Sequence, residues 1–444
     1  MMWFWGLLFS FSATLSPLSA GAITLSEALA IAMENNLEVR VAAAQKTAAD
    51  ESLSMARAGF MPTVEVSETY SKTNNPMYAF GARLNQERIA QQDFEPSALN
   101  NPEAMANWKT AVSLRQPLFA GGQIHNEYRK AESAARIAEL DLGQTRREVA
   151  FRVVEGWLNL SLLNKSLETL EHSKSLALES LKVARNRVDA GMALNSDLLD
   201  MQINYERVRK EINATLANIQ LAKSALKTLL GAGELSPQFG EYTFEPGVVD
   251  VDESLKVAYE NRADLQKTSA GVAMAGYDVK SAAGGFLPSV GLAADYEWNQ
   301  EDLAKTGGES YMVAVEARWN LFSGGRDAAR YKAARAVEEA HKFHERLLKD
   351  SIRTEVERDI SGLKTAVENS VIALRQVSLA EESHRIISQQ FIEGLKSSAD
   401  LLASETQLER ARLNKIASDH EMLLSRAKLD LTLGLDSGSI KEKR

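Results

Sequence analysis

A seven-residue repeat of apolar positions runs through residues 122–190. The stretch contains no proline and is dominated by alanine, leucine, glutamate and arginine, which are good helix formers. As a single helix its 69 residues would measure roughly 100 Å, which a compact enzyme core cannot hold. An ordinary core helix rarely reaches this length without a break. Two apolar rows form an a/d pattern that predicts coiled-coil packing: Val153, Leu160, Leu167, Leu181 and Val188 in one row, and Leu163, Leu170, Ala177 and Ala184 in the other.

The long pattern occurs twice. The sequence Leu-Phe-Ala-Gly-Gly at 118–122 returns 203 residues later as Leu-Phe-Ser-Gly-Gly at 321–325, and Gly191 returns as Gly394 at the same offset. A second long helix is therefore predicted over 325–393. Two copies that keep their length over more than a hundred residues indicate a duplicated unit.

Residues 289–299 and 311–320 alternate between apolar and more polar side chains, which is the pattern of β-strands. About ten residues per strand, one apolar face and aromatic ends are typical of outer-membrane β-barrels. A soluble, half-buried hairpin shows the same alternation, but the aromatic ends favour the membrane. The first copy repeats the pattern less cleanly over about 63–71 and 108–117. The stretch 72–107 between them is rich in Asn, Gln and Pro and is expected to form a long extracellular loop.

Shorter helices complete each copy. One amphipathic helix is predicted to open each repeat, at 24–58 with Ser26 as its cap and at 254–283. Glycine suits the left-handed position at the end of each long helix. The tips are expected at 190–197 and 393–400, followed by returning helices at 196–230 and 400–433. The whole chain is then divided into a signal peptide at 1–22, repeat 1 at 23–231, a linker at 232–250, repeat 2 at 251–434 and a charged tail at 435–444.

The composition excludes several functions. The chain is 45% hydrophobic and 25% charged, as folded proteins are, and its net charge of −9 without a basic run gives no sign of nucleic-acid binding. Cysteine is absent, which removes disulfides, thiolate metal sites and cysteine nucleophiles. His341 and His344 are spaced for zinc but lack a third ligand, so a solvated helix face is favoured and no cofactor is expected. No catalytic constellation stands out, and no later segment approaches the ~20 apolar residues of a spanning helix.

Four strands cannot close a transmembrane barrel within one chain. Open sheet edges are not tolerated in lipid, and single-chain barrels begin at eight strands, so two or three chains are the smallest assemblies. The pairs Gly121-Gly122 and Gly324-Gly325 lack the Lys-Ser/Thr that follows in a phosphate-binding loop. They are therefore expected to form strand-to-helix corners.

In these features the chain resembles the TolC-type outer-membrane efflux protein family. The resemblance rests on the duplicated strand–strand–long-helix unit, the Pro-Leu-Phe-x-Gly-Gly sequence at 117–122 and the Gly-x5-Asp-Leu-Leu sequences at 191–199 and 394–402. It implies a homotrimer in the outer membrane of a Gram-negative bacterium, with a twelve-stranded β-barrel continued by a twelve-helix periplasmic α-barrel. It also implies docking to a periplasmic adaptor and to an inner-membrane pump of the RND, ABC or MFS type. The implied function is a passive exit duct for tripartite efflux or type I secretion.

The resemblance also assigns roles to the tips. Asp400 matches the position at which the family's tubes narrow through a ring of carboxylates, and the second acidic position of the family is Ala403 here. Such a ring would attract cations and resist closing when ionised. Helix capping is the other interpretation of these aspartates. The expected gate residues are Asp197, Asp200, Asp400, Lys396 and Ser196, with Asp197 near Lys396, and the expected adaptor-docking residues are Gly191, Leu198, Gly394 and Leu401.

Two other functions stay open at this point. A periplasmic coiled-coil adaptor or scaffold would have helical hairpins, but it would lack duplicated ten-residue strands with aromatic ends. A secreted hydrolase with helical arms would need a catalytic constellation that the sequence does not display. The residues name neither the substrate nor the class of pump.

Overall fold

The computed structural model describes residues 22–232, 236–240, 242–243, 250–304, 306–436 and 441–442. The predicted signal peptide, except for its last residue, and parts of the predicted linker and tail lie outside these residues. The chain divides into two compact units. The sheet unit takes residues 44–140 and 264–348, and the helical unit takes residues up to 43, 141–263 and residues from 349 onward.

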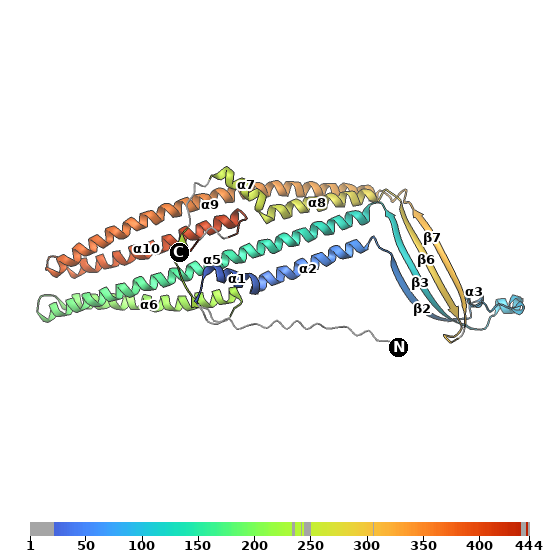
Figure 1. Ribbon diagram of the computed structural model, residues 1–444, viewed down its shortest axis with the longest axis horizontal. Helices are drawn as coiled ribbons and strands as arrows, with labels where there is room; N and C mark the ends of the chain where they lie inside the picture. Colours follow the sequence, from blue (N-terminus) through green and yellow to red (C-terminus); the bar gives the residue numbers. More distant parts are fainter. Residues whose placement is uncertain are drawn as a thin grey trace. The chain divides into compact units, whose positions relative to one another are not determined.

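The sheet unit is built on four antiparallel strands in the order β2-β3-β6-β7 (Figure 1). They are β2 (Thr63–Thr73), β3 (Met105–Ala120), β6 (Ser289–Gln300) and β7 (Gly308–Arg318). Tyr70 pairs with Trp108, and Tyr296 with Tyr311, so the aromatic residues expected at the strand ends lie beside one another. The β3–β6 register shifts between Pro117 and Phe119, where proline has no N–H to donate to the ladder.

The two faces of this sheet differ as the alternation predicts. On one face Val66 and Val313 are 69% and 65% exposed, although they are purely apolar. On the other face charged side chains pair across strands, with Arg115 Nη1 2.9 Å from Asp295 Oδ1 and Lys109 Nζ 2.5 Å from Glu297 Oε1. We refer to these as the apolar face and the polar face.

Glycine corners join the sheet to the long helices α5 (Gln123–Asp189) and α9 (Arg326–Ile392). Gly121, Gly122, Gly324 and Gly325 all have positive φ, between 58° and 84°. Gly121 is also in close backbone contact with Gly284, because a Cβ at Gly121 would lie 2.3 Å from the Gly284 carbonyl oxygen. All four corner positions therefore need glycine for their backbone conformation. Gly121 needs it for space as well, whereas an added Cβ at Gly324 or Gly325 would meet nothing within 4 Å.

Side-chain contacts link the helices of the sheet unit. The unit contains most of α2 (Leu37–Ala58), nearly all of α8 (Ala263–Gly284) and the first parts of α5 and α9. The Phe60 ring meets the Tyr128 ring of α5 edge-on at 6.1 Å. Lys130 of α5 forms an ion pair with Asp278 of α8 at 2.8 Å.

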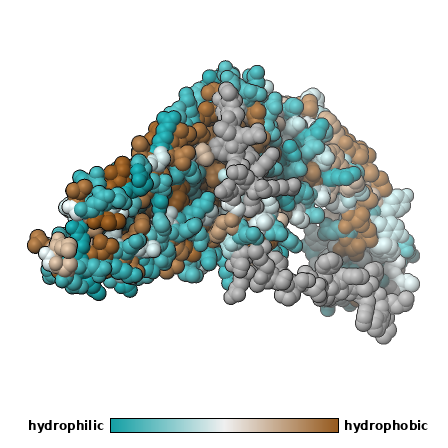
Figure 2. Space-filling model, turned by 60° about the vertical axis from the view of Figure 1, so that its left-hand side comes forward, coloured by the Kyte–Doolittle hydropathy of each residue, from teal (hydrophilic) through white to brown (hydrophobic). Residues whose placement is uncertain are grey.

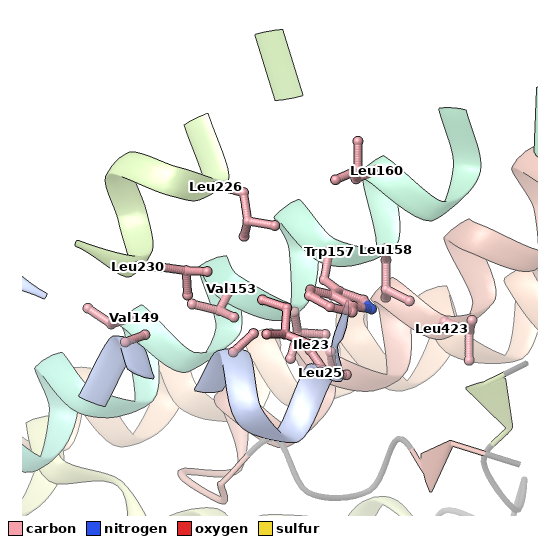
Figure 3. Packing of buried hydrophobic residues seen from close by; sticks show 14 of the residues in the cluster. Ile23, Leu25, Val149, Val153, Trp157, Leu158, Leu160, Leu226, Leu230 and Leu423 are labelled. Atoms are coloured by element: carbon pink, nitrogen blue, oxygen red, sulfur yellow. The ribbon is translucent and has the colours of Figure 1, made fainter. Parts of the chain in front are cut away.

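The helical unit has its largest apolar core around Trp157 of α5 (Figure 3). Trp157 is fully buried and donates from Nε1 to the Tyr242 hydroxyl at 2.5 Å. Its neighbours in the core include Ile23, Leu25, Val149, Val153, Leu160, Leu226 and Leu230. The unit's other helices are α1 (Leu25–Asn35), α6 (Asn195–Leu230), α7 (Val251–Asn261) and α10 (Ser398–Thr432), and its short strands are β1 (Ala22–Ile23), β4 (Ser236–Pro237), β5 (Tyr242–Thr243) and β8 (Lys441–Glu442).

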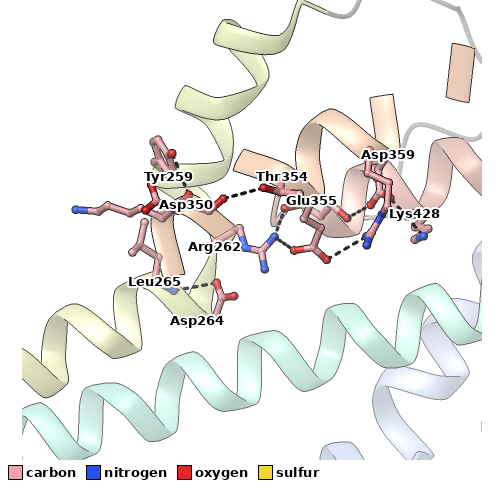
Figure 4. A network of polar contacts seen from close by, with 12 residues as sticks. Tyr259, Arg262, Asp264, Leu265, Asp350, Thr354, Glu355, Asp359 and Lys428 are labelled. Carbon is pink, nitrogen blue, oxygen red and sulfur yellow. Dashed lines mark hydrogen bonds and ion pairs between the residues drawn. The ribbon is translucent and has the colours of Figure 1, made fainter. Parts of the chain in front are cut away.

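The first helix of each repeat is broken in two, so the prediction of one continuous helix was wrong. In repeat 1 the break lies at Asn36, whose side chain accepts from the backbone N–H of Glu38 at 2.9 Å and donates to the Leu229 carbonyl at 2.7 Å. In repeat 2 it lies at Arg262, which donates to the Thr432 carbonyl at 3.1 Å and pairs with Glu355 at 2.7 Å (Figure 4). Both residues therefore bond to the last turn of a returning helix.

Three further expectations need correction. The cap of α1 is Thr24, which forms a capping box with Glu27, rather than Ser26. The stretch expected to be a loop at 72–107 contains α3 (Pro76–Asn85), the 3₁₀ helix η1 (Gln91–Phe94) and α4 (Pro96–Asn100). Strand β7 ends at Arg318 rather than at residue 320. Among the residues that the structure describes, no helix is both long and apolar enough to cross a membrane.

Candidate gate at the helical tips

Each long helix ends in a glycine with a left-handed backbone, Gly191 at φ 69° and Gly394 at φ 82°. The N–H of the next residue donates to the carbonyl five positions back, at 2.7 Å in the first tip and 2.8 Å in the second. This is the Schellman arrangement, which satisfies carbonyls that the helix end leaves free. The two tips are therefore the same turn built twice.

Asp400 takes part in capping the second returning helix, as the capping-box partner of the N-cap residue Ser397. The Ser397 hydroxyl accepts from the Asp400 N–H at 3.1 Å, and Asp400 Oδ2 accepts from the Ser397 hydroxyl at 2.8 Å and from its N–H at 3.1 Å. These bonds, and to a lesser degree the charge of Lys396, hold the pKa of Asp400 below its usual value. Capping is thus a role that the structure shows for Asp400, alongside the role expected from the family resemblance.

The first returning helix begins differently. Its cap position is Leu194, which has no polar side chain, and Asp197 Oδ2 accepts only from the Leu194 N–H at 3.4 Å. Ser196 lies inside the first turn of α6 and does not occupy its cap position. Asp200 is exposed one turn further along α6.

The expected pair between Asp197 and Lys396 is absent from the ion pairs of the described residues. Lys396 Nζ lies 4.0 Å from Asp400 Oδ1 instead. Lys396 immediately precedes the N-cap of α10 and Asp400 lies in its first turn, so a local contact replaces the one expected across the tips.

A small apolar core joins the two hairpins near the tips. Leu401, expected on the adaptor-docking surface, is only 3% exposed and belongs to this core, and Leu198 packs against it. Leu401 therefore does not present a docking side chain. The core consists of Ala184, Met201, Phe391 and Leu401. Three apolar side chains stay exposed at the tips: Met192, Leu194 and Leu395. Figure 2 shows hydrophobic residues there, at its left-hand end.

Arg187, which is not among the residues predicted from the sequence, links the end of α5 to the end of α9. Its Nη1 donates to the Phe391 carbonyl at 3.1 Å, and its guanidinium lies 4.8 Å from the centre of the Phe391 ring. A cation there complements the negative end of the helix dipole and the face of the ring. The available signal was a basic residue in the last turn of a long helix.

A buried polar cluster lies deeper between the hairpins. Arg207 of α6 reaches Glu409 of α10 at 2.9 Å, and Asn204 Nδ2 lies 3.4 Å from Glu405 Oε2. Ser180 of α5 donates to the other oxygen of Glu405. Burial and the nearby charge of Glu409 raise the pKa of Glu405. We call Ser180, Asn204, Arg207, Glu405 and Glu409 the inter-hairpin cluster; it ties α6 to α10 by charge and hydrogen bonds.

His384 takes part in a hydrogen-bonding contact between α9 and α10. His384 Nδ1 lies 3.1 Å from the Ser404 hydroxyl, and burial lowers the pKa of this histidine. Across the described part of the chain, His, Asp and Glu side chains form no group that could hold a metal ion.

Comparisons with known proteins agree on one family. The sequence profile described as "Outer membrane efflux protein" matches residues 28–232 and 255–435, one match in each repeat. The outer membrane efflux protein BepC of Brucella suis is 20% identical over 408 residues, covering 90% of this chain and 83% of BepC. The proteases secretion protein PrtF of Dickeya chrysanthemi is 23% identical over 420 residues, covering 90% of this chain and 85% of PrtF.

The fold of a solved structure agrees with this assignment. The outer membrane protein VceC of Vibrio cholerae superimposes with a TM-score of 0.79 at 16% identity, over 93% of this chain and 96% of VceC. The profile matches most of both repeats, and relatives align along nearly the whole chain. The chain therefore belongs to the outer membrane efflux protein family, the TolC-like channels of the Gram-negative outer membrane that extend into the periplasm.

Proposed function

We propose that three copies of this chain close into a twelve-stranded β-barrel continued by twelve helices, and that this tube is gated at the helical tips. The family makes the chain an exit duct for efflux or type I secretion. Membership of this family does not favour the alternative function as a periplasmic coiled-coil adaptor. The number of copies, the pairing of the sheet edges between copies and the gate at the tips go beyond what the family assignment establishes.

The open sheet is the observation that carries the proposal. Strands β2 and β7 are the two edges of the four-stranded sheet, and each has one side without a partner strand in the described chain. Unpaired backbone groups cannot remain in lipid. Because β2 and β7 run antiparallel, the edge of one copy can pair with the opposite edge of the next and complete an all-antiparallel barrel.

Barrel size supports three copies as the smallest assembly with a lumen. Two copies would supply eight strands, and a barrel of eight is just wide enough for its own side chains to fill. Three copies supply twelve and leave room for a lumen. The apolar face then meets lipid, and the polar face, with Arg115, Asp295, Lys109 and Glu297, lines the lumen.

The tips support the gate. Asp400 of three copies would form a carboxylate ring, which favours cations and resists closing when ionised. Opening would separate the two hairpins of each copy, which Arg187, the small apolar core and the inter-hairpin cluster hold together. The exposed Met192, Leu194 and Leu395 are available for an adaptor that connects the duct to an inner-membrane pump.

Cysteine cross-linking tests the closure, because the chain has no cysteine of its own. Val66→Cys on β2 is combined in turn with cysteine at Tyr311, Val313 or Val315 on β7, and the protein is oxidised in membranes. One combination should give a covalent species of three chains and nothing larger. The matched control moves the first cysteine to Val112 on the central strand β3, where it should not cross-link. A product that stops at two chains, or an open ladder, contradicts the trimer.

A further inference from the structure

The segment between β2 and β3, residues 74–104, has a fold of its own, which we call the cap. The Asn75 side chain caps α3 by accepting from the Met77 N–H at 3.2 Å, and Pro76 occupies the first position of the helix. Arg83 of α3 forms an ion pair with Asp93 of η1. Asp93 is buried and also accepts from the Ala90 N–H at 2.7 Å. These contacts make the cap a defined structure rather than a polar loop.

The cap is docked onto the end of the sheet. Gln86 Nε2 donates to Asn107 Oδ1 at 2.8 Å, and Asn107 Nδ2 donates to Asn299 Oδ1 at 2.9 Å, so a chain of amides runs from the cap through β3 to β6. Arg88 forms an ion pair with Glu301 of the β6–β7 turn at 3.0 Å. At Gly308, the first residue of β7, an added Cβ would lie only 2.2 Å from the Asn85 carbonyl oxygen.

The docking uses the polar face of the sheet. Asn107 alternates with Trp108 and lies on the side of Lys109, and Asn299 lies on the side of Glu297. At this end of the sheet the polar face is covered, since Asn107 and Asn299 are 9% and 1% exposed. The apolar face stays bare at the same end, where Tyr311 is 79% exposed. The cap therefore lies on the side that faces the lumen in the proposed trimer.

The free surface of the cap is unusually apolar for a segment at the outer end of the strands. Met77 and Tyr78 are 79% and 69% exposed, and Leu84 and Phe94 are exposed as well. Closure of β2 onto β7 of the next copy would place three caps around one axis. These exposed apolar side chains would then face the caps of the two neighbouring copies.

We propose that the three caps fold into the extracellular mouth of the duct and form a second, apolar constriction there, separate from the gate at the tips. This inference rests on the proposed trimeric duct. An apolar constriction hinders the passage of water and of small hydrophilic solutes, because the narrow path dewets. The caps would hold back small polar solutes at the outer mouth. Their docking through hydrogen bonds and ion pairs would let a large or amphiphilic substrate push them aside.

Access to the lumen from outside the cell tests this proposal independently of the tips. Ala293 on the polar face is replaced by cysteine, and intact cells are treated with a charged maleimide too large for general porins. Two variants address the cap in this background. Gly308→Ala disrupts the docking of the cap, because the added methyl group clashes with the Asn85 carbonyl. The triple change of Met77, Tyr78 and Phe94 to serine removes the apolar surface and leaves the docking contacts in place.

The proposal predicts slow labelling of the starting protein and a severalfold faster rate in both variants. Gly81→Ala is the matched control, because Gly81 is in α3 and an added Cβ there meets nothing within 4 Å. This control should keep the slow rate. Equal rates in all four proteins overturn the proposal, and acceleration by Gly308→Ala alone overturns the apolar character of the constriction.

A second cysteine position separates failure of the cap from failure of the duct. Val313→Cys lies on the apolar face and should stay unlabelled in lipid. If Ala293→Cys reacts and Val313→Cys does not, the duct stands and the rates decide the role of the cap. If Val313→Cys reacts instead, the assignment of the two faces is wrong, and the cap proposal falls with it.

Discussion

Replacing Arg207 by methionine is expected to shift the duct toward its open state. The Arg207 guanidinium bridges the two hairpins by reaching Glu409 of α10 at 2.9 Å, and it also contacts Glu211 at 2.8 Å and Asn204 at 3.0 Å. Glu409 is only 5% exposed. Methionine keeps most of the packing of the aliphatic stem, but it leaves the Glu409 carboxylate buried without its cation.

The magnitude follows from the burial of the pair. Breaking a fully buried ion pair costs about 3–5 kcal/mol, whereas an exposed pair contributes about 0.2–1 kcal/mol. The Arg207 side chain is 35% exposed and the Glu409 side chain is 6% exposed. The energy of this half-buried pair should therefore lie between the two limits. We expect a loss of about 2 kcal/mol, which is about 30-fold in the equilibrium between joined and separated hairpins.

The assay is the ratio of open to closed time in single-channel recordings from planar bilayers. Arg209→Met is the matched control, because the contacts that the structure shows for Arg209 stay within its own helix: it forms an ion pair with Glu206 at 2.9 Å and lies over the ring of Tyr205. Adding Glu409→Gln to Arg207→Met removes the stranded charge and should recover part of the closed state. The reasoning is refuted if Arg207→Met behaves like Arg209→Met, or if the second change opens the channel further.

Further predictions concern pH and the tips. Because burial raises the pKa of Glu405, the fold favours the neutral acid, and stability falls as pH rises from the ordinary glutamate pKa through the raised one. Glu405→Gln should therefore raise the melting temperature at neutral pH and leave it unchanged in acid; a difference that is constant with pH contradicts this. Ser397→Ala removes the cap of α10 and should cost about 1 kcal/mol of stability, measured by thermal unfolding, whereas Ser196→Ala should cost little. Gly394→Ala forces alanine to φ 82° and should destabilise by about 1 kcal/mol, whereas Gly143→Ala inside α5 should stabilise; hydrogen exchange at the tip and melting temperatures check both.

Periodic features could be predicted from the sequence. The a/d rows fall on α5 and α9, and the alternating strands pair with their apolar residues on one face. Both patterns record burial on one side of an element, which repeats at the period of the element. The Gly-Gly pairs were likewise recognisable, since a strand that turns sharply into a helix needs left-handed residues.

Features that depend on one distant contact were missed. The breaks at Asn36 and Arg262 exist because each side chain reaches a distant carbonyl, 193 residues away for Asn36 and 170 residues away for Arg262. The two residues share no chemistry that a repeat search would detect. The docking of Gln86 on Asn107 has no period either. Lys396 was assigned a partner across the tips, while the local carboxylate of Asp400 was closer in the chain.

The central claim is that the protein forms a conducting tube with its constriction at the tips. The most direct test records single-channel conductance of the purified trimer in planar bilayers, for the unchanged chain and for Asp400→Ala. The account predicts small, cation-selective openings of uniform size that become larger and less selective in the variant. A folded trimer that gives no conductance in either form would contradict the tube, and identical openings in both would remove Asp400 from the constriction.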